Sequence, residues 1–323
     1  ECHRPHDADA ALLSPFRGDL RAFQRHGGDT ADQLSTLLAY DETRGTPFSN
    51  APYSAYQRLE SGGSVLIADT GRAPPIELSL DAHAGCLSFE FSSPKQSLIV
   101  VNCGMPSVGR EDWRQLARAT AAHSTVTFNN ASSARFVELA SFRRVLGGSP
   151  ILGGPNKIAV SREENDDSIV LRASHDGYAD RFGIVHERIL TLAADGMRLD
   201  GEDIFLAADG GAQLQTAQDE FAIRFHLHPL VKATRLTDGH GVMLMTPNKE
   251  VWTFSAREDR VEVEDSVYLA ASEGPRRTMQ IVIHGHARTA SRVQWSFSQA
   301  NPTTLTGGGA PRRSRDDEPR LPL

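Results

Sequence analysis

The stretch DAHAGCLSFEF, residues 81–91, alternates apolar and polar side chains with a period of two, which predicts a β-strand. Three apolar side chains fall on one face of this strand: Leu87, Phe89 and Phe91. Counted back in steps of two, the same face reaches Gly85, His83 and Asp81. An unbroken strand would therefore place an imidazole and a carboxylate at the end of an inward-facing stripe, unless a bulge at Gly85 shifts the register.

Short apolar runs separated by turn residues fill the chain from residue 53 to about residue 300. The run LIVV, residues 98–101, is apolar on both faces, which is typical of a central strand covered on both sides. Such a long series of runs, without a long amphipathic helix after Ala119, favours a large antiparallel β-sandwich over βαβ units. Other clear strand predictions cover residues 65–67, 169–172, 184–192, 221–227, 242–245, 251–254, 279–283 and 293–297.

The two ends of the chain differ from this middle part. Residues 12–40 space their apolar side chains as helices do, and predict one or two short helices before a linker that ends at residue 52. A further short helix or turn is expected at residues 110–119. Residues 301–323 contain almost nothing apolar, so we expect a disordered tail there.

Length and charge limit the classes of function. The chain has 323 residues, enough for one large domain or two small ones with an ample core. Its formal net charge of −7 argues against a nucleic-acid surface as the main role. No apolar run approaches the roughly 20 residues of a membrane span. The three cysteines lack the spacing of a zinc knuckle.

Three motifs carry a resemblance to a known family. They are HAGCLSFE at residues 83–90, VNCG at residues 101–104 and TAAHSTV at residues 120–126. Together they resemble motifs of heparinase II/III-like polysaccharide lyases, in which a large α/α toroid precedes a C-terminal β-sandwich. The resemblance implies that residues 53–300 form this sandwich. It implies also that residues 1–52 are a helical remnant and linker from a toroid that this chain lacks.

The same resemblance implies a structural zinc ion in the sandwich. Its ligands would be His83, His123 and the residue at position 102, where the family has a carboxylate and this chain has Asn102. A neutral amide is a poorer zinc ligand than a carboxylate. A rearranged set of Asp81, His83 and His123 would restore two imidazoles and one carboxylate. In the alternative without metal, both histidines are buried polar groups that hydrogen-bond within the fold.

A lyase acting on a uronic-acid polysaccharide must neutralise the substrate carboxylate, remove the C5 proton and protonate the leaving oxygen. Within this chain Tyr178 is the best phenol for acid–base work, and Arg181 beside it could contact a sugar acid. Asp81 occupies the position of a catalytic-site histidine of the family. The family's other catalytic residues belong to the toroid. The alternative for Tyr178 is a packed tyrosine in an ordinary turn.

The strand predicted at residues 221–228 carries a basic stripe. Its apolar residues face the core, so Arg224, His226 and His228 line the other face. This stripe could bind a carboxylated sugar or line a domain interface, and imidazole charge would be tunable near neutral pH. The alternative is a solvated outer face.

These observations lead to two hypotheses about function. The first is a heparinase II/III-like lyase that cleaves an acidic polysaccharide by β-elimination, with the chain as its sandwich part and the toroid as its partner. The second is a non-catalytic carbohydrate-binding or envelope-assembly module that retained the fold. The family implies a location in the periplasm or at the cell envelope, although Glu1 and its neighbours lack a signal-peptide pattern.

Overall fold

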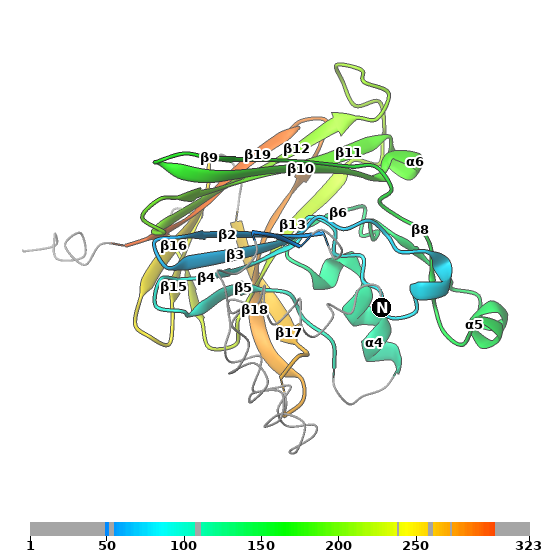
Figure 1. The fold of residues 1–323 in the computed structure, drawn as a ribbon, viewed down its shortest axis with the longest axis horizontal. Coiled ribbons are helices and arrows are strands. Elements are labelled where there is room, and N and C mark those ends of the chain that lie inside the picture. The colour runs from blue at the N-terminus through cyan, green and yellow to red at the C-terminus, as the bar shows by residue number, and fades with distance from the viewer. Residues whose placement is uncertain are drawn as a thin grey trace, which may run out of the picture.

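The computed structural model describes residues 49–51, 55–106, 111–237, 239–257, 261–271 and 273–300. Within them two large antiparallel sheets face each other and form a β-sandwich (Figure 1). This confirms the predicted mainly β fold. The helices predicted at residues 12–40 and the tail predicted at residues 301–323 lie outside the described residues.

One sheet has nine strands in the order β1-β2-β3-β4-β5-β13-β18-β17, with β6 paired to β13. Its strands are β1 (Asn50–Ala51), β2 (Tyr56–Ser61), β3 (Ser64–Asp69), β4 (Phe89–Ser92), β5 (Leu98–Val101), β6 (Val126–Phe128), β13 (Glu220–Leu227), β17 (Val261–Tyr268) and β18 (Arg276–His286). The central position of β5 confirms the interpretation of its apolar run, because it lies between β4 and β13 and is largely buried.

The second sheet has eight strands in the order β14-β15-β16-β19-β12-β11-β10-β9. These are β9 (Ile158–Glu164), β10 (Ser168–Tyr178), β11 (Ile184–Ala193), β12 (Arg198–Ala207), β14 (Lys232–Arg235), β15 (Gly241–Met245), β16 (Val251–Ala256) and β19 (Arg292–Gln299). The remaining elements are a small pair, β7 (Arg135–Phe136) with β8 (Ile151–Gly153), the helices α4 (Glu111–Arg118), α5 (Ala140–Leu146) and α6 (Ala179–Phe182), and the 3-10 turns η1 (Ile76–Leu78) and η2 (Thr120–Ala122). None of the helices described is long and apolar enough to cross a membrane.

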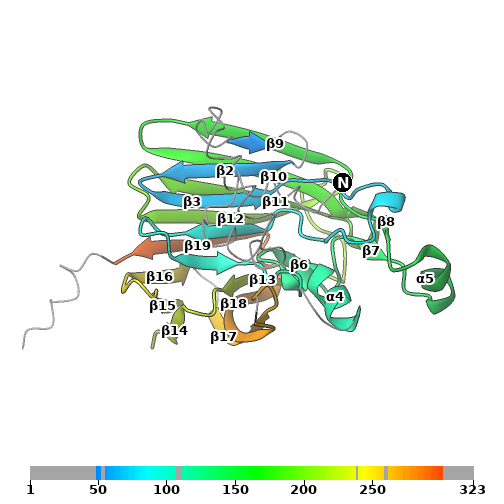
Figure 2. The same ribbon diagram turned by 60° about the horizontal axis from the view of Figure 1, so that its bottom comes forward.

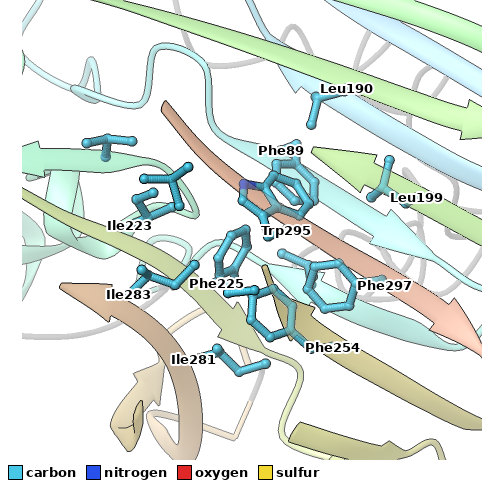
Figure 3. Packing of buried hydrophobic residues seen from close by; sticks show 14 of the residues in the cluster. Phe89, Leu190, Leu199, Ile223, Phe225, Phe254, Ile281, Ile283, Trp295 and Phe297 are labelled. Carbon is cyan, nitrogen blue, oxygen red and sulfur yellow. The ribbon is translucent and has the colours of Figure 1, made fainter. Parts of the chain in front are cut away.

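Aromatic side chains from both sheets fill the space between them. Phe225 of β13 packs edge-on against Trp295 of β19 at 4.7 Å between ring centroids, and Phe89 of β4 stacks on the same indole at 5.6 Å (Figure 3). Offset and edge-to-face rings contribute about 0.5–1.5 kcal/mol per pair beyond the area that they bury. The strict alternation of buried and half-buried residues along β11 shows the same packing, because one face of the strand points into this core.

The long connections between the strands of the nine-stranded sheet gather at one end of the sandwich. There η1, α4, the β7–β8 pair and α5 lie beyond the strand ends (Figure 2). The helix α4 confirms the short helix predicted at residues 110–119. Several large apolar side chains are exposed at this end: Leu78, Leu116, Leu139, Phe142, Val145 and Leu152.

Candidate functional site

The segment that leads into β4 is a loop and not the strand predicted for residues 81–88. Leu87 has a φ of 60°, in the left-handed region that interrupts an extended strand. Its N–H donates to the carbonyl of Asp69 at 2.7 Å, and β4 begins only at Phe89. The prediction of one continuous inward-facing stripe from Asp81 to Phe91 is therefore wrong.

This loop is held against the end of α4 by buried hydrogen bonds. Arg118 is 1% exposed, and its guanidinium donates to the carbonyls of Ser79, Ala82 and Ser149. The hydroxyl of Thr120 donates to the carbonyl of Ala84 at 2.6 Å. Because each of these carbonyls is satisfied by a side chain, the loop keeps a defined path without strand pairing.

The docked loop brings His83 against His123. The Nδ1 atom of His83 lies 2.9 Å from the Nε2 atom of His123, and the two rings meet edge to face at 5.1 Å. The Nδ1 atom of His123 is 2.8 Å from the carbonyl oxygen of Ala119, which can only accept, so this nitrogen carries the proton. It follows that Nε2 of His123 is the acceptor and that His83 donates to it.

The environment of His123 keeps its imidazole neutral at neutral pH. His123 is 6% exposed, and burial lowers its pKa to about 4, although the hydrogen bond to the Ala119 carbonyl opposes this shift. The close packing also requires the glycine at position 85. A Cβ atom on Gly85 would lie 2.8 Å from Cδ2 of His123, closer than van der Waals contact allows.

Asp81 and Asn102 do not join the two imidazoles. The Oδ1 atom of Asp81 accepts a hydrogen bond from Nη2 of Arg114 on α4 at 2.7 Å. The side-chain oxygen of Asn102 accepts the N–H of Ser124 at 2.9 Å, and its amide nitrogen lies 3.4 Å from Oε1 of Glu90. Each side chain therefore has a structural contact of its own.

A small pocket opens beside His83. Its lining includes Asp69, Arg72, Cys86 and Ser133. Arg72 is exposed and forms no hydrogen bond or ion pair with any residue in the described ranges. An unpaired guanidinium at the rim of a pocket can hold a carboxylate or sulfate through two parallel hydrogen bonds. Sequence reasoning missed Arg72, because a lone arginine in a loop forms no pattern.

Comparison with known proteins assigns the family. The family model "Heparinase II/III-like, C-terminal" matches residues 43–296. The chain belongs to this family. The resemblance that the three motifs carry is thereby confirmed.

Relatives of this heparinase II/III-like domain include a curated protein and several solved structures. FtsZ-localized protein C of Caulobacter vibrioides is 31% identical over 293 residues, which are 88% of this chain and 49% of that protein. The heparan sulfate lyase HepC of Pedobacter heparinus superposes with a TM-score of 0.60 at 14% identity, over 91% of this chain and 42% of the lyase. A heparinase III gene product superposes with a TM-score of 0.58 at 12% identity, over 90% of this chain and 42% of that protein. The two structural likenesses concern the fold alone, and the chain spans about half the length of its curated relative.

The side chains around the two histidines of the heparinase II/III-like domain fit a zinc ion only in part. The carbonyl of Ala119 fixes the tautomer in which Nε2 of His123 can bind a metal. The 2.9 Å from this atom to Nδ1 of His83 is a hydrogen-bond distance, shorter than the roughly 3.3 Å between two ligands of a tetrahedral zinc ion. The oxygen of Asn102 is already used, and Asp81 is paired with Arg114. Neither set predicted from the sequence, with Asn102 or with Asp81, is assembled among the described residues, so zinc here stays a prediction.

Tyr178 and Arg181 are placed as structural residues of the heparinase II/III-like domain. Tyr178 is fully buried, its hydroxyl donates to the carbonyl of Val126 at 2.7 Å, and burial raises its pKa far above that of a free phenol. Arg181 donates to the carbonyl of Ser132. This arrangement matches the packed-tyrosine alternative, and a catalytic role of Tyr178 or Arg181 stays a prediction.

The basic stripe predicted on β13, formed by Arg224, His226 and His228, is partly or fully buried. His226 is 3% exposed and contacts the carbonyl of Ala121 at 3.0 Å and the hydroxyl of Ser266 at 2.8 Å. Arg224 is half-buried and donates to Thr127, while His228 packs edge-on against the Tyr268 ring. His226 therefore does not line an open face that a sugar could reach, because η2 covers this part of the sheet. Sugar binding by the stripe stays a prediction.

A buried polar network under the candidate site was not predicted. Asp203 of β12 is completely buried and accepts from His186, from Arg188 and from the indole of Trp295 at 2.7–3.1 Å. Burial alone would raise the pKa of Asp203, but Arg188 and the hydrogen bond from His186 hold it well below its usual range. Arg188 also donates to the carbonyls of Leu87 and Ser124, so it ties β11 to the loops that carry the two histidines.

Proposed function

We propose that this domain is a non-catalytic module that binds an acidic polysaccharide at the pocket beside His83. The exposed guanidinium of Arg72 at this pocket, which has no partner among the described residues, carries the proposal. A uronate or sulfate group needs such a cation, and His83 next to it can hydrogen-bond a sugar hydroxyl. The groups that could act as acid or base, Asp81 and Tyr178, are engaged in structural bonds, which favours binding over cleavage.

Replacing Arg72 with alanine should weaken the binding of uronate polymers to the full-length protein by about tenfold or more, because a hydrogen bond to a charged group contributes about 1.5–3 kcal/mol. Isothermal titration against a panel of uronate polymers measures this affinity. Arg198→Ala is the matched control, since Arg198 is also an exposed arginine but pairs with Asp200 on β12. Equal affinities of wild type and Arg72→Ala, or no binding to any polymer, would refute the proposal.

A second candidate is β-elimination of the same polymer by the full-length protein. The likeness of fold to HepC over 91% of this chain favours it. Elimination creates a conjugated double bond, so the samples used for titration can be followed by ultraviolet absorbance. Absorbance that grows with time would show that the protein is a lyase and not a non-catalytic binding module. Constant absorbance over a broad panel of polymers would favour the binding module.

The relative named FtsZ-localized protein C supports the envelope-assembly form of the binding module. A polysaccharide-binding domain that serves assembly would work at the cell envelope, and we propose that location, in the periplasm, for this chain. A fluorescent fusion of the full-length protein tests it. Uniform fluorescence in the cytoplasm would exclude the periplasm.

We also propose that the exposed apolar end, defined by Leu116, Leu139, Phe142, Val145 and Leu152, meets an α/α toroid in the longer protein. Large apolar side chains left exposed at one end of a domain can mark an interface. The sandwich alone should therefore self-associate in size-exclusion chromatography, and Phe142→Glu with Val145→Glu should reduce this. A sandwich that remains monomeric at high concentration would contradict the idea.

A further inference from the structure

A second group of potential metal ligands lies on the outer face of the strand pair β17–β18, on strands that carry neither His83 nor His123. Glu262 and Glu264 are two residues apart on β17, so they share a face of the strand. The register pairs Glu264 with Gln280 and Glu262 with Val282 of β18, which puts His284 on the same face. The alternate residues of both strands point into the core: Val261, Ile281 and Ile283.

The ligand atoms of this group lie close enough for one ion. One atom each of Glu262, Glu264 and His284 lies within 4.8 Å of the others. Nε2 of His284 is 3.1 Å from Oε1 of Glu264, and two ligands of a tetrahedral zinc ion, each about 2.0–2.2 Å from it, are about 3.3 Å apart. The side chains of His284 and Glu264 are 43% and 36% exposed, so an ion can reach them and they can adjust.

We propose that Glu262, Glu264 and His284 bind a divalent transition-metal ion of the zinc class, with water in the remaining position. The imidazole nitrogen favours zinc and its neighbours over calcium or magnesium, which prefer oxygen ligands only. Among the described residues this is the group of three histidine, cysteine or carboxylate side chains whose ligand atoms come together. Three protein ligands with one open position are typical of zinc sites that exchange water or bind a substrate group.

Gln280 gives independent support. Its Nε2 donates to Oε2 of Glu264 at 3.0 Å, which is the kind of outer contact that orients a metal-binding carboxylate. Its Oε1 is buried and has no hydrogen-bond partner within the described ranges. A buried acceptor without a donor is uncommon, and a water molecule bound to the proposed ion would supply one.

The charges around the group favour a cation. Two carboxylates face the site from β17, and the guanidinium of Arg224 on β13 lies near enough to Glu264 for the two charges to interact. His284 contacts Glu264, and Gln280 adds no charge. Both carboxylates would be ligands of a divalent ion, whereas the guanidinium of Arg224 would repel it.

Zinc titration of the purified chain at neutral pH tests the proposal, with Co²⁺ absorption as a second readout of the ligand set. We expect wild type and His83→Ala to bind an ion at this site with equal affinity, since His83 belongs to the other pocket. His284→Ala should bind at least about tenfold more weakly. His286→Ala is the matched control, because His286 lies on the same strand, is exposed and sits near Asp219 instead.

Each result of the zinc titration either supports or overturns the proposed metal site. A loss of affinity in His284→Ala and in Glu264→Gln, with His286→Ala unchanged, supports the site. Unchanged affinity in His284→Ala, or no zinc binding by His83→Ala, overturns it. His284→Ala and Glu264→Gln replace exposed or half-exposed side chains, and thermal unfolding without metal verifies that these two variants remain folded.

Discussion

Replacing Asp203 with alanine is expected to lower the free energy of unfolding by about 3–5 kcal/mol, as breaking a buried ion pair generally does. The carboxylate is completely buried and accepts from three side chains: His186, Arg188 and Trp295. Alanine would leave the positive charge of Arg188 in the core without its counter-charge. Because Arg188 also holds the loops around the candidate site, loss of ligand binding should accompany the loss of stability.

Asp200→Ala is the matched control for this experiment. Asp200 lies on the same strand, three residues earlier, and is 44% exposed in its pair with Arg198. Exposed pairs contribute about 0–1 kcal/mol, so this variant should stay close to wild type. Urea unfolding at neutral pH measures both changes. Similar values for the two variants would mean that the buried network adds no more than a surface pair does.

The burial of this network was available from the sequence, because two of its residues keep the period-two pattern of β11. His186 and Arg188 share the parity of Ile184, Leu190 and Leu192 along β11, and the structure buries all five. The period-two rule places them in the core. Polar side chains are usually exposed, so their chemistry alone does not indicate this burial. The alternation of the strand places them correctly.

The same period-two rule failed for residues 81–88, the segment before β4. A left-handed φ at Leu87 ends the extended conformation, and a non-glycine residue rarely adopts this conformation. The alternation of apolar and polar residues in the sequence could not reveal this change of backbone conformation. The contact of His83 with His123 was nevertheless anticipated, because family motifs place both residues at one site, whereas a separation of forty residues in the chain predicts nothing.

Burial of His226 shows a third limit of sequence reasoning. Alternation predicted correctly that it points away from the apolar face of β13. It could not show that η2 crosses that face and that the Ala121 carbonyl and Ser266 meet the imidazole. Which segment covers an outer face depends on contacts between distant parts of the chain. For the same reason Arg72, the residue on which the proposed function depends, was visible only in the structure.

Lowering the pH from about 6.5 to about 4.5 is expected to reduce the free energy of unfolding by several kcal/mol. Burial lowers the pKa of His123 to about 4 and that of His226 to about 3, against about 6.5 for an unfolded histidine. In this window the unfolded chain binds protons that the folded chain does not bind, so stability present above pH 6.5 is lost as the pH falls. Each histidine contributes up to about 1.4 kcal/mol per pH unit. Burial of His175 and His186 acts in the same direction.

Urea unfolding at intervals between pH 8 and pH 4.5 measures this slope, and His226→Gln isolates one of its sources. Glutamine can donate to the Ala121 carbonyl and accept from Ser266, as the imidazole does, but it cannot take up a proton in this range. The comparison at pH 8 gives the structural cost of the substitution, and the difference in slope below pH 6.5 gives the contribution of the titrating group. We expect the free energy of unfolding to depend less steeply on pH in the variant, by the equivalent of about one bound proton, or about 1.4 kcal/mol per pH unit. A wild-type protein that is equally stable at pH 7 and pH 4.5 would show that these histidines are already protonated in the fold, or that their burial is not maintained in solution.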